Sequence, residues 1–554
     1  MHEIKRILLV DPPVTRPKEY SASKMRVSPF FPLGLGYLAA VLKAIGYEVA
    51  ILDCLIEGID KGERAYEGGM LRYGLSDEEI SAKIREWHPD IVGVSCIFSA
   101  KDFDAKNICR LSKKIFPQTP TVVGGPHAGA ACREMMAAEG AIDFIIIGEG
   151  EASFPSLILA IQTGRGTERV DGLCYRTENA ICKTDKTIYI ENLDSLPFPD
   201  RDSVGMSRYL DLGYAHDRFM NRPFTQVITS RGCPFKCTFC ALGNHWGAAQ
   251  RRRSAGNVLA EIDVLVNRYG VREIHFEDDN LTADKGRAME IFSGLKARRY
   301  GITWTVPTGM AVSSLDEDLL ASMAQSGCYS VTLGVESGSQ FVVSKLMRKP
   351  VDLKRVPGLV KAIRNNGMLA KGFFILGYPG ETKDTLCQTV EFAKSLELDW
   401  TFFFIATPLP HTEMYNTALR DGYIQLGDFN PLTSLHDSVI RSPEFDAEYL
   451  SELRERAIVD LNFRNNPNLR KYSVDQAIAD FRHVLDLYPH FDFAHEAMGD
   501  ALQRKSDVQG ACEHWRRAIQ LNPGNAIAAQ RLQDIASTGK NNPATGIGTD
   551  EAKK

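Results

Sequence analysis

The sequence has no long apolar run and no recognisable secretory leader. No window of its 554 residues approaches 18 uninterrupted apolar residues, so we expect no membrane-spanning helix. The amino-terminal MHEIKR leads directly into the strand-like ILLVD, which leaves no room for an apolar signal region with a small-residue cleavage site. We therefore expect a cytoplasmic protein.

A long basic stripe is also missing. The 65 Lys and Arg residues and the 70 Asp and Glu residues give a formal net charge of -5. Nucleic-acid-binding proteins usually carry a clustered positive surface, and the basic triplet at 251–253 is more typical of a solvated or phosphate-contacting loop. We expect no nucleic-acid partner.

The composition is that of a globular protein with several domains. Apolar residues make up 44% and charged residues 24% of the chain, which argues against disorder outside the tail. The length predicts three or four domains. Twelve cysteines in a long cytoplasmic chain favour buried thiols and one metal site over disulfides.

The first module reads as an α/β fold. From residue 4 to about 165, short runs rich in Ile and Val alternate with helical stretches, a pattern that predicts a doubly wound parallel sheet. Strands are expected at 7–10, 49–52, 91–95, 121–123 and 142–147. Ligands of such sheets bind at the carboxyl ends of the strands, where this sequence carries small or polar residues. These residues are Ser95, Gly124, Gly125 and Glu149. The sheet alone could hold a flavin, a nucleotide, a phosphoryl group or no ligand.

Three cysteines follow a strand and a glycine in the centre of the chain. Cys233, Cys237 and Cys240 have the spacing C-x3-C-x2-C, so three thiolates point toward one centre. A structural zinc site takes four ligands, and His245 could supply the fourth. Three cysteines on one short loop instead suit an iron-sulfur cluster with one iron left open. We favour the cluster because of the motifs that follow.

Beyond the cysteines, strands and helices alternate with the spacing of a parallel barrel. Strands are expected at 273–277, 302–307, 330–335, 372–376 and 400–406. Their carboxyl ends carry polar or glycine residues, which taken singly could be helix caps or turns. These residues include Glu277, Asp278, Glu336 and Gly377. Their recurrence at successive strand ends favours a shared ligand site.

The cysteine motif, with Phe239 as its aromatic residue, resembles that of the radical S-adenosylmethionine (SAM) superfamily. HFEDDNLT, LGVESG and ILGYPGET look like its second-, fourth- and fifth-strand elements. The resemblance implies a partial (β/α)6 TIM-like barrel, a 4Fe-4S cluster that binds SAM, and an electron donor such as flavodoxin or ferredoxin. It assigns the metal and catalytic roles to Cys233, Cys237 and Cys240, and the SAM contacts to Phe239, Glu277, Asp278, Glu336 and Gly377. The motif after the sixth strand departs from the superfamily pattern, and the fifth-strand motif matches it loosely.

The first module resembles the cobalamin (B12)-binding domain that precedes some radical SAM domains. The resemblance lies in DPP, PLGLGYLAAVLKAIGYEV, VGVSCIFSA, VVGGPHAGA and IDFIIIGEGE. It implies that Ser95, Gly124 and Gly125 flank the nucleotide tail of cobalamin, with Glu149 as a further contact. The Asp-x-His-x-x-Gly signature is absent from the sequence, so we expect no lower-face histidine ligand on cobalt. His127, in a cleft-forming loop, is more typical of a histidine that bonds to the protein.

The carboxyl-terminal part is expected to be helical. Ala477, Phe481 and Pro489 recur 34 residues later as Ala511, Trp515 and Pro523, which is the period of tetratricopeptide (TPR) repeats. These helices either pack on the rest of the chain or bind a partner protein. The predicted organisation is a cobalamin domain at 1–165, a linker with a hairpin at 166–215, a radical SAM core at 216–425, a helical connector at 426–472, TPR-like repeats at 473–537 and a disordered tail at 538–554.

As a whole the chain resembles class B radical SAM methylases. The resemblance implies a methyltransferase that acts on an unactivated carbon of a small-molecule or natural-product precursor through a 5'-deoxyadenosyl radical. One alternative is an oxidative cyclase or rearrangement enzyme, of the tetrapyrrole type or similar, without methyl transfer. Another is a non-catalytic scaffold that binds cobalamin and SAM, and the intact cysteines and strand-end carboxylates argue against it.

Overall fold

The computed structural model describes residues 3–20, 27, 29–212, 218–247, 249–428 and 438–540. By contacts the chain divides into two compact units, residues 1–454 and 455–554. Among the described residues, every helix is too short or too polar to cross a membrane. The tail expected at 538–554 lies outside the described residues from residue 541 onward.

The first unit begins with a seven-stranded sheet in the order β10-β9-β8-β7-β6-β1-β3. The strands from β8 to β3 are mutually parallel, which confirms the doubly wound fold. Their bounds are β1 Arg6–Asp11, β3 Glu48–Asp53, β6 Ile91–Ser95, β7 Thr121–Gly124 and β8 Phe144–Ile146. Each lies within a few residues of the range expected from the Ile- and Val-rich runs.

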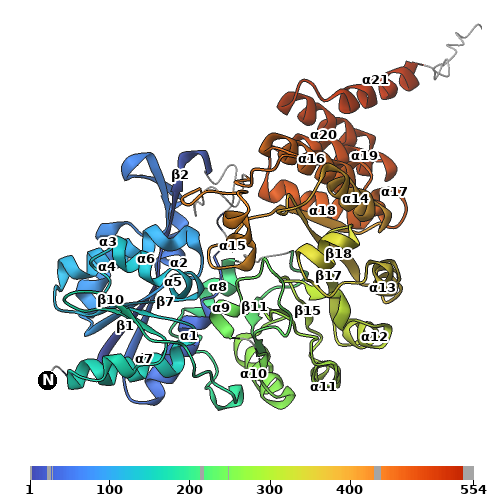
Figure 1. Ribbon diagram of the computed structural model, residues 1–554. Helices are drawn as coiled ribbons and strands as arrows, with labels where there is room; N and C mark the ends of the chain where they lie inside the picture. Colours follow the sequence, from blue (N-terminus) through green and yellow to red (C-terminus); the bar gives the residue numbers. More distant parts are fainter. Residues whose placement is uncertain are drawn as a thin grey trace, which may run out of the picture. The chain divides into compact units, whose positions relative to one another are not determined.

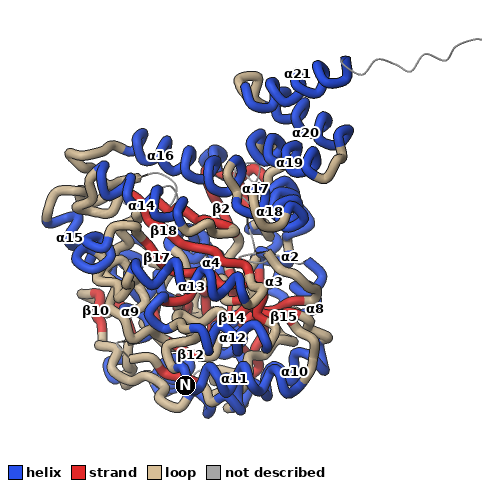
Figure 2. The backbone as a smooth tube through the Cα atoms, turned by 90° about the vertical axis from the view of Figure 1, so that its right-hand side faces the viewer, coloured by secondary structure: helices blue, strands red, loops and turns tan. Residues whose placement is uncertain are grey.

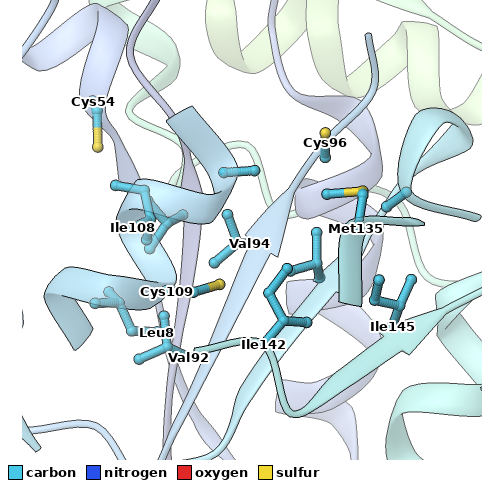
Figure 3. Close-up of a cluster of buried hydrophobic side chains, with 14 of the residues drawn as sticks. Leu8, Cys54, Val92, Val94, Cys96, Ile108, Cys109, Met135, Ile142 and Ile145 are labelled. Atoms are coloured by element: carbon cyan, nitrogen blue, oxygen red, sulfur yellow. The ribbon is translucent and has the colours of Figure 1, made fainter. Parts of the chain in front are cut away.

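Helices cover both faces of this sheet (Figure 1). On one face lie α3 Asp77–Trp87, α4 Asp102–Ile115 and α6 Cys132–Ala138, and on the other α1 Leu33–Ala44 and α7 Gly150–Thr163. Figure 3 shows the core of the first face, where Leu8, Val92 and Val94 meet Ile108 and Met135. Burial of strand residues on both faces explains why their runs are continuously apolar rather than alternating.

The interval 166–215, expected to be a linker, contributes strands to this sheet. The strands β9 Leu173–Arg176 and β10 Ile181–Lys183 form the expected hairpin, and β9 pairs antiparallel with β8. The sheet therefore continues beyond residue 165, because the hairpin satisfies the edge of β8. The helix α8 Met206–Leu212 follows in the same interval.

A second, small sheet has no counterpart in the sequence-based expectation. It consists of β2 Val14–Pro17, β5 Met70–Tyr73 and β4 Glu63–Tyr66, all antiparallel. Arg72 of β5 joins this sheet to α4, because its guanidinium lies 3.2 Å from the Asp104 carboxylate of α4 and 2.9 Å from the Thr15 hydroxyl of β2. The strands are short and partly polar, so apolar periodicity does not mark them.

The central module is built on parallel strands in the order β11-β14-β15-β17-β18-β19, with β16 Met310–Ala311 beside β17. The bounds are β11 Phe224–Val227, β14 Glu273–Phe276, β15 Thr303–Thr305, β17 Cys328–Glu336, β18 Leu369–Leu376 and β19 Trp400–Ile405. Among the described residues no pairing joins β11 to β19, as expected for a partial barrel. Helices alternate with the strands, and Figure 2 shows them in blue against the red strands. They are α10 Ala255–Tyr269, α11 Lys285–Arg298, α12 Glu317–Gln325, α13 Val356–Asn365 and α14 Lys383–Ser395.

After the sheet come α15 Glu413–Arg420 and α16 Ala447–Val459. The second unit is helical, with α17 Pro467–Arg470, α18 Val474–Leu487, α19 Asp492–Arg504, α20 Val508–Leu521 and α21 Ala526–Lys540. Trp515 is fully buried, and a Cβ added at Gly499 would come within 2.4 Å of its indole nitrogen. This close approach explains the small residue at position 499. The TPR assignment and the domain limits stay predictions.

Candidate active site

The three cysteines lie on a loop between two short paired strands. β12 Ser230–Arg231 pairs antiparallel with β13 Arg251–Arg252, and this ribbon closes the base of the segment between them. Gly232 opens the loop with a φ of +85°, and a Cβ there would come within 2.8 Å of the carbonyl oxygen of Ala249. Its amide donates a hydrogen bond of 2.9 Å to the Asp279 carboxylate. Only glycine fits this entry to the loop.

The three thiols are half-buried and near one another. Burial raises the pKa of Cys237 to about 12 and raises the pKa values of Cys233 and Cys240. The charge of Cys233 adds to the rise in pKa at Cys237 and at Cys240. Yet in the described part of the chain no three His, Cys, Asp or Glu side chains converge tightly enough to bind a single metal ion. A zinc site needs four donors at about 2.0–2.3 Å from one ion. Three cysteines on one loop suit a 4Fe-4S cluster that leaves one iron open, so this donor set fits a cluster better than zinc.

Glu277 and Asp278, the two carboxylates that follow β14, differ in burial. Asp278 is fully buried and accepts hydrogen bonds of 3.0 Å from the Thr229 amide and 2.5 Å from the Ser230 hydroxyl. Burial raises its pKa, and these bonds oppose the rise. Asp278 thus holds the strand end that leads into the cysteine loop, while Glu277, whose amide bonds to Val227, is half-buried.

Glu336 and Phe239 border one cavity of about 220 Å³. The lining also includes Phe373, Ile375, Tyr378, Phe404, Leu409 and Met414. Glu336 has a φ of +70°, an uncommon backbone conformation for a residue with a side chain, and it forms an ion pair with Lys349. Strained backbone of this kind concentrates at functional sites. The structure thus places Glu336 and Phe239 together beside the cysteine loop.

Gly377 stands apart from this cavity. Its φ is +83°, and a Cβ there would come within 2.6 Å of the Leu450 side chain. The neighbouring Tyr378 does line the cavity, and its hydroxyl lies 2.5 Å from that of Thr238 inside the cysteine motif. Tyr378 was not among the residues expected from the sequence. A polar aromatic residue directly after the fifth-strand glycine was the available signal.

A second cavity, of about 270 Å³, opens at the carboxyl ends of the α/β sheet. Ser95, Gly124, Gly125 and Glu149, the four residues expected at a cobalamin site, all line it. A Cβ added at Gly124 would meet no atom within 4 Å, so this glycine leaves space open for a ligand. A Cβ at Gly125 would instead come within 2.6 Å of the Cys96 carbonyl oxygen, and its φ is +117°. Gly124 therefore leaves space for a ligand, and Gly125 forms the turn. Both observations fit a bound cofactor tail.

The carboxylate of Glu149 is already engaged by the central module. It lies 2.7 Å from the guanidinium groups of both Arg231 and Arg251, and it accepts a hydrogen bond of 2.9 Å from the Ile190 amide. Burial would raise the pKa of Glu149, but the Arg231 charge and these hydrogen bonds lower it below its usual value. Arg231 also binds Glu151 at 2.5 Å. Glu149 thus joins the two modules and would reach a ligand mainly through its backbone.

Residues 227–231 and 243–246 of the central module also line the α/β cavity. They contribute Ile228, Arg231, His245 and Trp246, none of which the sequence motifs assigned to cobalamin. The signal in the sequence was their position on either side of the cysteine motif. His127 lies near the same cavity, but its Nδ1 is 2.9 Å from the Ser99 hydroxyl and its Nε2 is 3.5 Å from the Asp102 carboxylate. Both ring nitrogens of His127 therefore have partners within the protein.

Two family models match the chain in the order of these modules. The B12 binding domain matches residues 26–158, and the radical SAM superfamily matches residues 227–393. The first contains Ser95, Gly124, Gly125 and Glu149 of the α/β cavity, and the second begins just before the cysteine loop.

Individual relatives match across both modules. The chain is 32% identical over 469 residues to a cytidylyl-2-hydroxyethylphosphonate methyltransferase of Streptomyces wedmorensis, covering 79% of this chain and 87% of that protein. It is 27% identical to an anaerobic magnesium-protoporphyrin IX monomethyl ester cyclase of Rubrivivax gelatinosus, covering 69% of this chain and 65% of that one. Among solved structures, the cobalamin-dependent SAM radical enzyme OxsB with aqua-cobalamin and SAM bound has the same fold, with a TM-score of 0.65 and 14% identity over 98% of this chain and 82% of that one. The chain therefore belongs to the family of cobalamin-dependent radical SAM enzymes, whose cofactors are a 4Fe-4S cluster, SAM and cobalamin.

Proposed function

We propose that this enzyme transfers a methyl group to an unactivated carbon of a small organic molecule. The observation that carries the proposal is that the cysteine loop borders both cavities. Arg231 and His245, on either side of the three cysteines, line the α/β cavity, and Phe239 within the motif lines the 220 Å³ cavity. Two cofactors held at these places would flank one substrate. The identity to a methyltransferase over most of both chains supports the same reaction.

When bound, the cluster and SAM supply an adenosyl radical that removes hydrogen from carbon, and cobalamin supplies the methyl group. The protein's part is to orient the groups and exclude water. We propose that Cys233, Cys237 and Cys240 hold the cluster and that Glu336, fixed by Lys349, contacts SAM. Phe373 and Phe404 line the 220 Å³ cavity with apolar surface. Such a lining suits a substrate whose reacting part is hydrocarbon and keeps water from reactive groups.

A second candidate is oxidation or ring formation without methyl transfer. The sequence similarity to the magnesium-protoporphyrin ester cyclase supports this second candidate, because that match also covers both modules. The methyltransferase of Streptomyces wedmorensis matches at higher identity and over more of both chains, so methyl transfer is the better-supported proposal.

Isotope labelling separates the two reactions. Cells that produce the enzyme would receive methionine with a deuterated methyl group, and their metabolites would be compared with those of cells that produce Cys237→Ala. Methyl transfer predicts a product heavier by three deuteriums that is absent with the variant. A product that depends on the enzyme but carries no label would contradict methyl transfer and favour oxidation or ring formation.

A further inference from the structure

The α/β cavity is closed by residues of the central module. The short helix α9 Gly243–Trp246 begins three residues after Cys240 and lies against α5 Pro126–Ala130, which follows the glycine pair (Figure 1). Two of its residues, His245 and Trp246, line the cavity together with Ser95 and Gly124. The segment that follows the predicted cluster cysteines thus completes the predicted cobalamin pocket.

His245 is the unusual member of this lining. Its side chain is 9% exposed, and its buried Nδ1 has no hydrogen-bond partner in the described part of the chain. A buried polar nitrogen without a partner destabilises the folded state, so such groups normally have one. Burial lowers the pKa of His245 to about 4, which keeps the imidazole neutral near pH 7. A neutral imidazole can donate through one nitrogen and accept through the other.

The shape of the cavity indicates which part of cobalamin the imidazole would meet. Leu9, Gly93 and Phe154 line its interior between the sheet and α7, and the volume is about 270 Å³. Pockets for drug-sized ligands are usually about 300–1,000 Å³, and a whole corrin ring with its side chains exceeds a drug in size. The cavity can therefore enclose the nucleotide tail while the corrin ring stays outside.

We propose that His245 hydrogen-bonds to the nucleotide tail of cobalamin and is a cofactor-binding residue supplied by the radical SAM module. The polar groups that it can meet there are the ribose hydroxyls, the phosphate and the free ring nitrogen of the base. Trp246 beside it, whose ring lies at a centroid distance of 4.3 Å from the imidazole, fixes the ring edge-on. The inference rests on the cobalamin site described above and does not depend on methyl transfer.

Cobinamide, which lacks the nucleotide tail, provides the direct test. The dissociation constants of hydroxocobalamin and of cobinamide would be measured by absorbance titration of the full chain, its His245→Ala and His245→Gln variants, and His127→Ala as the matched control. We expect His245→Ala to weaken cobalamin binding about tenfold, the usual weight of one hydrogen bond to a charged or buried group, and to leave cobinamide binding within twofold. His245→Gln, which keeps a donor and an acceptor, should recover most of the loss, and His127→Ala should change neither constant by more than about threefold.

The outcomes separate failure of this inference from failure of the site. Wild-type protein that does not bind hydroxocobalamin would overturn the cobalamin site itself. Wild-type binding with an unchanged constant in both His245 variants, or an equal loss for cobalamin and cobinamide, would overturn the tail contact. A nitrogen coupling from labelled histidine in the electron paramagnetic resonance spectrum of bound cob(II)alamin that disappears in His245→Ala would assign His245 to cobalt and also overturn the tail contact. Iron and sulfide contents equal to wild type in both variants would exclude an effect through the cluster.

Discussion

The two cofactor sites differ in how much of each the protein builds by itself. The α/β cavity is enclosed by strand ends and glycines whose backbone is fixed by the sheet, and Gly124 leaves part of it open. The cysteine loop instead holds three half-buried thiols with raised pKa values that do not converge on one point. The cavity is formed by packing and needs only its ligand. We expect iron and sulfide to complete the site at the loop, because metal binding and local folding are coupled.

The largest expected effect comes from removing a cluster ligand, which should leave the cobalamin site intact. Cys237→Ala should lose the cluster, from about four irons per chain to near zero after anaerobic reconstitution, because two thiolates on a loop hold it poorly. Cobalamin binding should stay within about threefold of wild type. Cys387→Ala, which removes an exposed thiol outside the loop, is the control. Iron and sulfide analysis makes the measurement, and full iron content in Cys237→Ala would refute the assignment.

The next prediction concerns a substitution in the cobalamin site. Gly124→Val should weaken hydroxocobalamin binding at least about a hundredfold, since its Cβ stands where no protein atom lies within 4 Å and the branched side chain would take up volume that the ligand needs. The fold should tolerate it because β-branched residues suit a strand. Gly140→Val, at an exposed position with equal room, is the control. Cobalamin affinity is read by absorbance titration, and retained affinity with a normal melting temperature would place the tail elsewhere.

The contact between the modules should matter for stability. Glu149→Ala leaves Arg251 and part of Arg231 without their buried partner, and we expect a loss of about 2 kcal/mol in the free energy of unfolding. The expected loss of unfolding free energy is smaller than for a fully unpaired buried charge, because Arg231 retains its ion pair with Glu151. Glu168→Ala, from an exposed pair with Arg169, should cost less than about 0.5 kcal/mol. Urea unfolding measures both, and equal costs would show that the buried network adds no stability.

The smallest effect is a pH dependence in the α/β domain. Burial, and next the Asp11 carboxylate, raise the pKa of Asp53 to about 7 from an ordinary 3.8. A carboxyl with a raised pKa in the folded state contributes stability below pH 4 that is lost as the pH rises to about 7. Asp53→Asn keeps the cap on α2 Cys54–Glu57, so it should remove this slope, on the order of 1 kcal/mol. Thermal unfolding at pH 5 and pH 7.5 is the measurement, and an unchanged slope in the variant would rule Asp53 out as its source.

The same contrast explains what could be predicted from the sequence. The cysteine spacing and the strand-end positions of Ser95 and Gly124 are local features, and periodicity marks the strands that carry them. The roles of Arg231 and His245 in the α/β cavity arise only when segments about a hundred residues apart pack together, which no local pattern encodes. The inward direction of Asp278 follows from the hydrogen bonds of Thr229 and Ser230, and its place in the motif does not reveal it. The pairing of the expected hairpin β9–β10 with β8 could not be predicted for the same reason, because β8 belongs to another predicted domain.

The most direct test of the account is SAM cleavage by the anaerobically reconstituted protein with cobalamin and a reductant. We expect wild-type protein to form 5'-deoxyadenosine and Cys237→Ala to form none above background. Absence of 5'-deoxyadenosine from wild-type protein with a full complement of iron and cobalamin, or undiminished formation by the variant, would contradict the assignment of the cysteine loop as the centre of this enzyme.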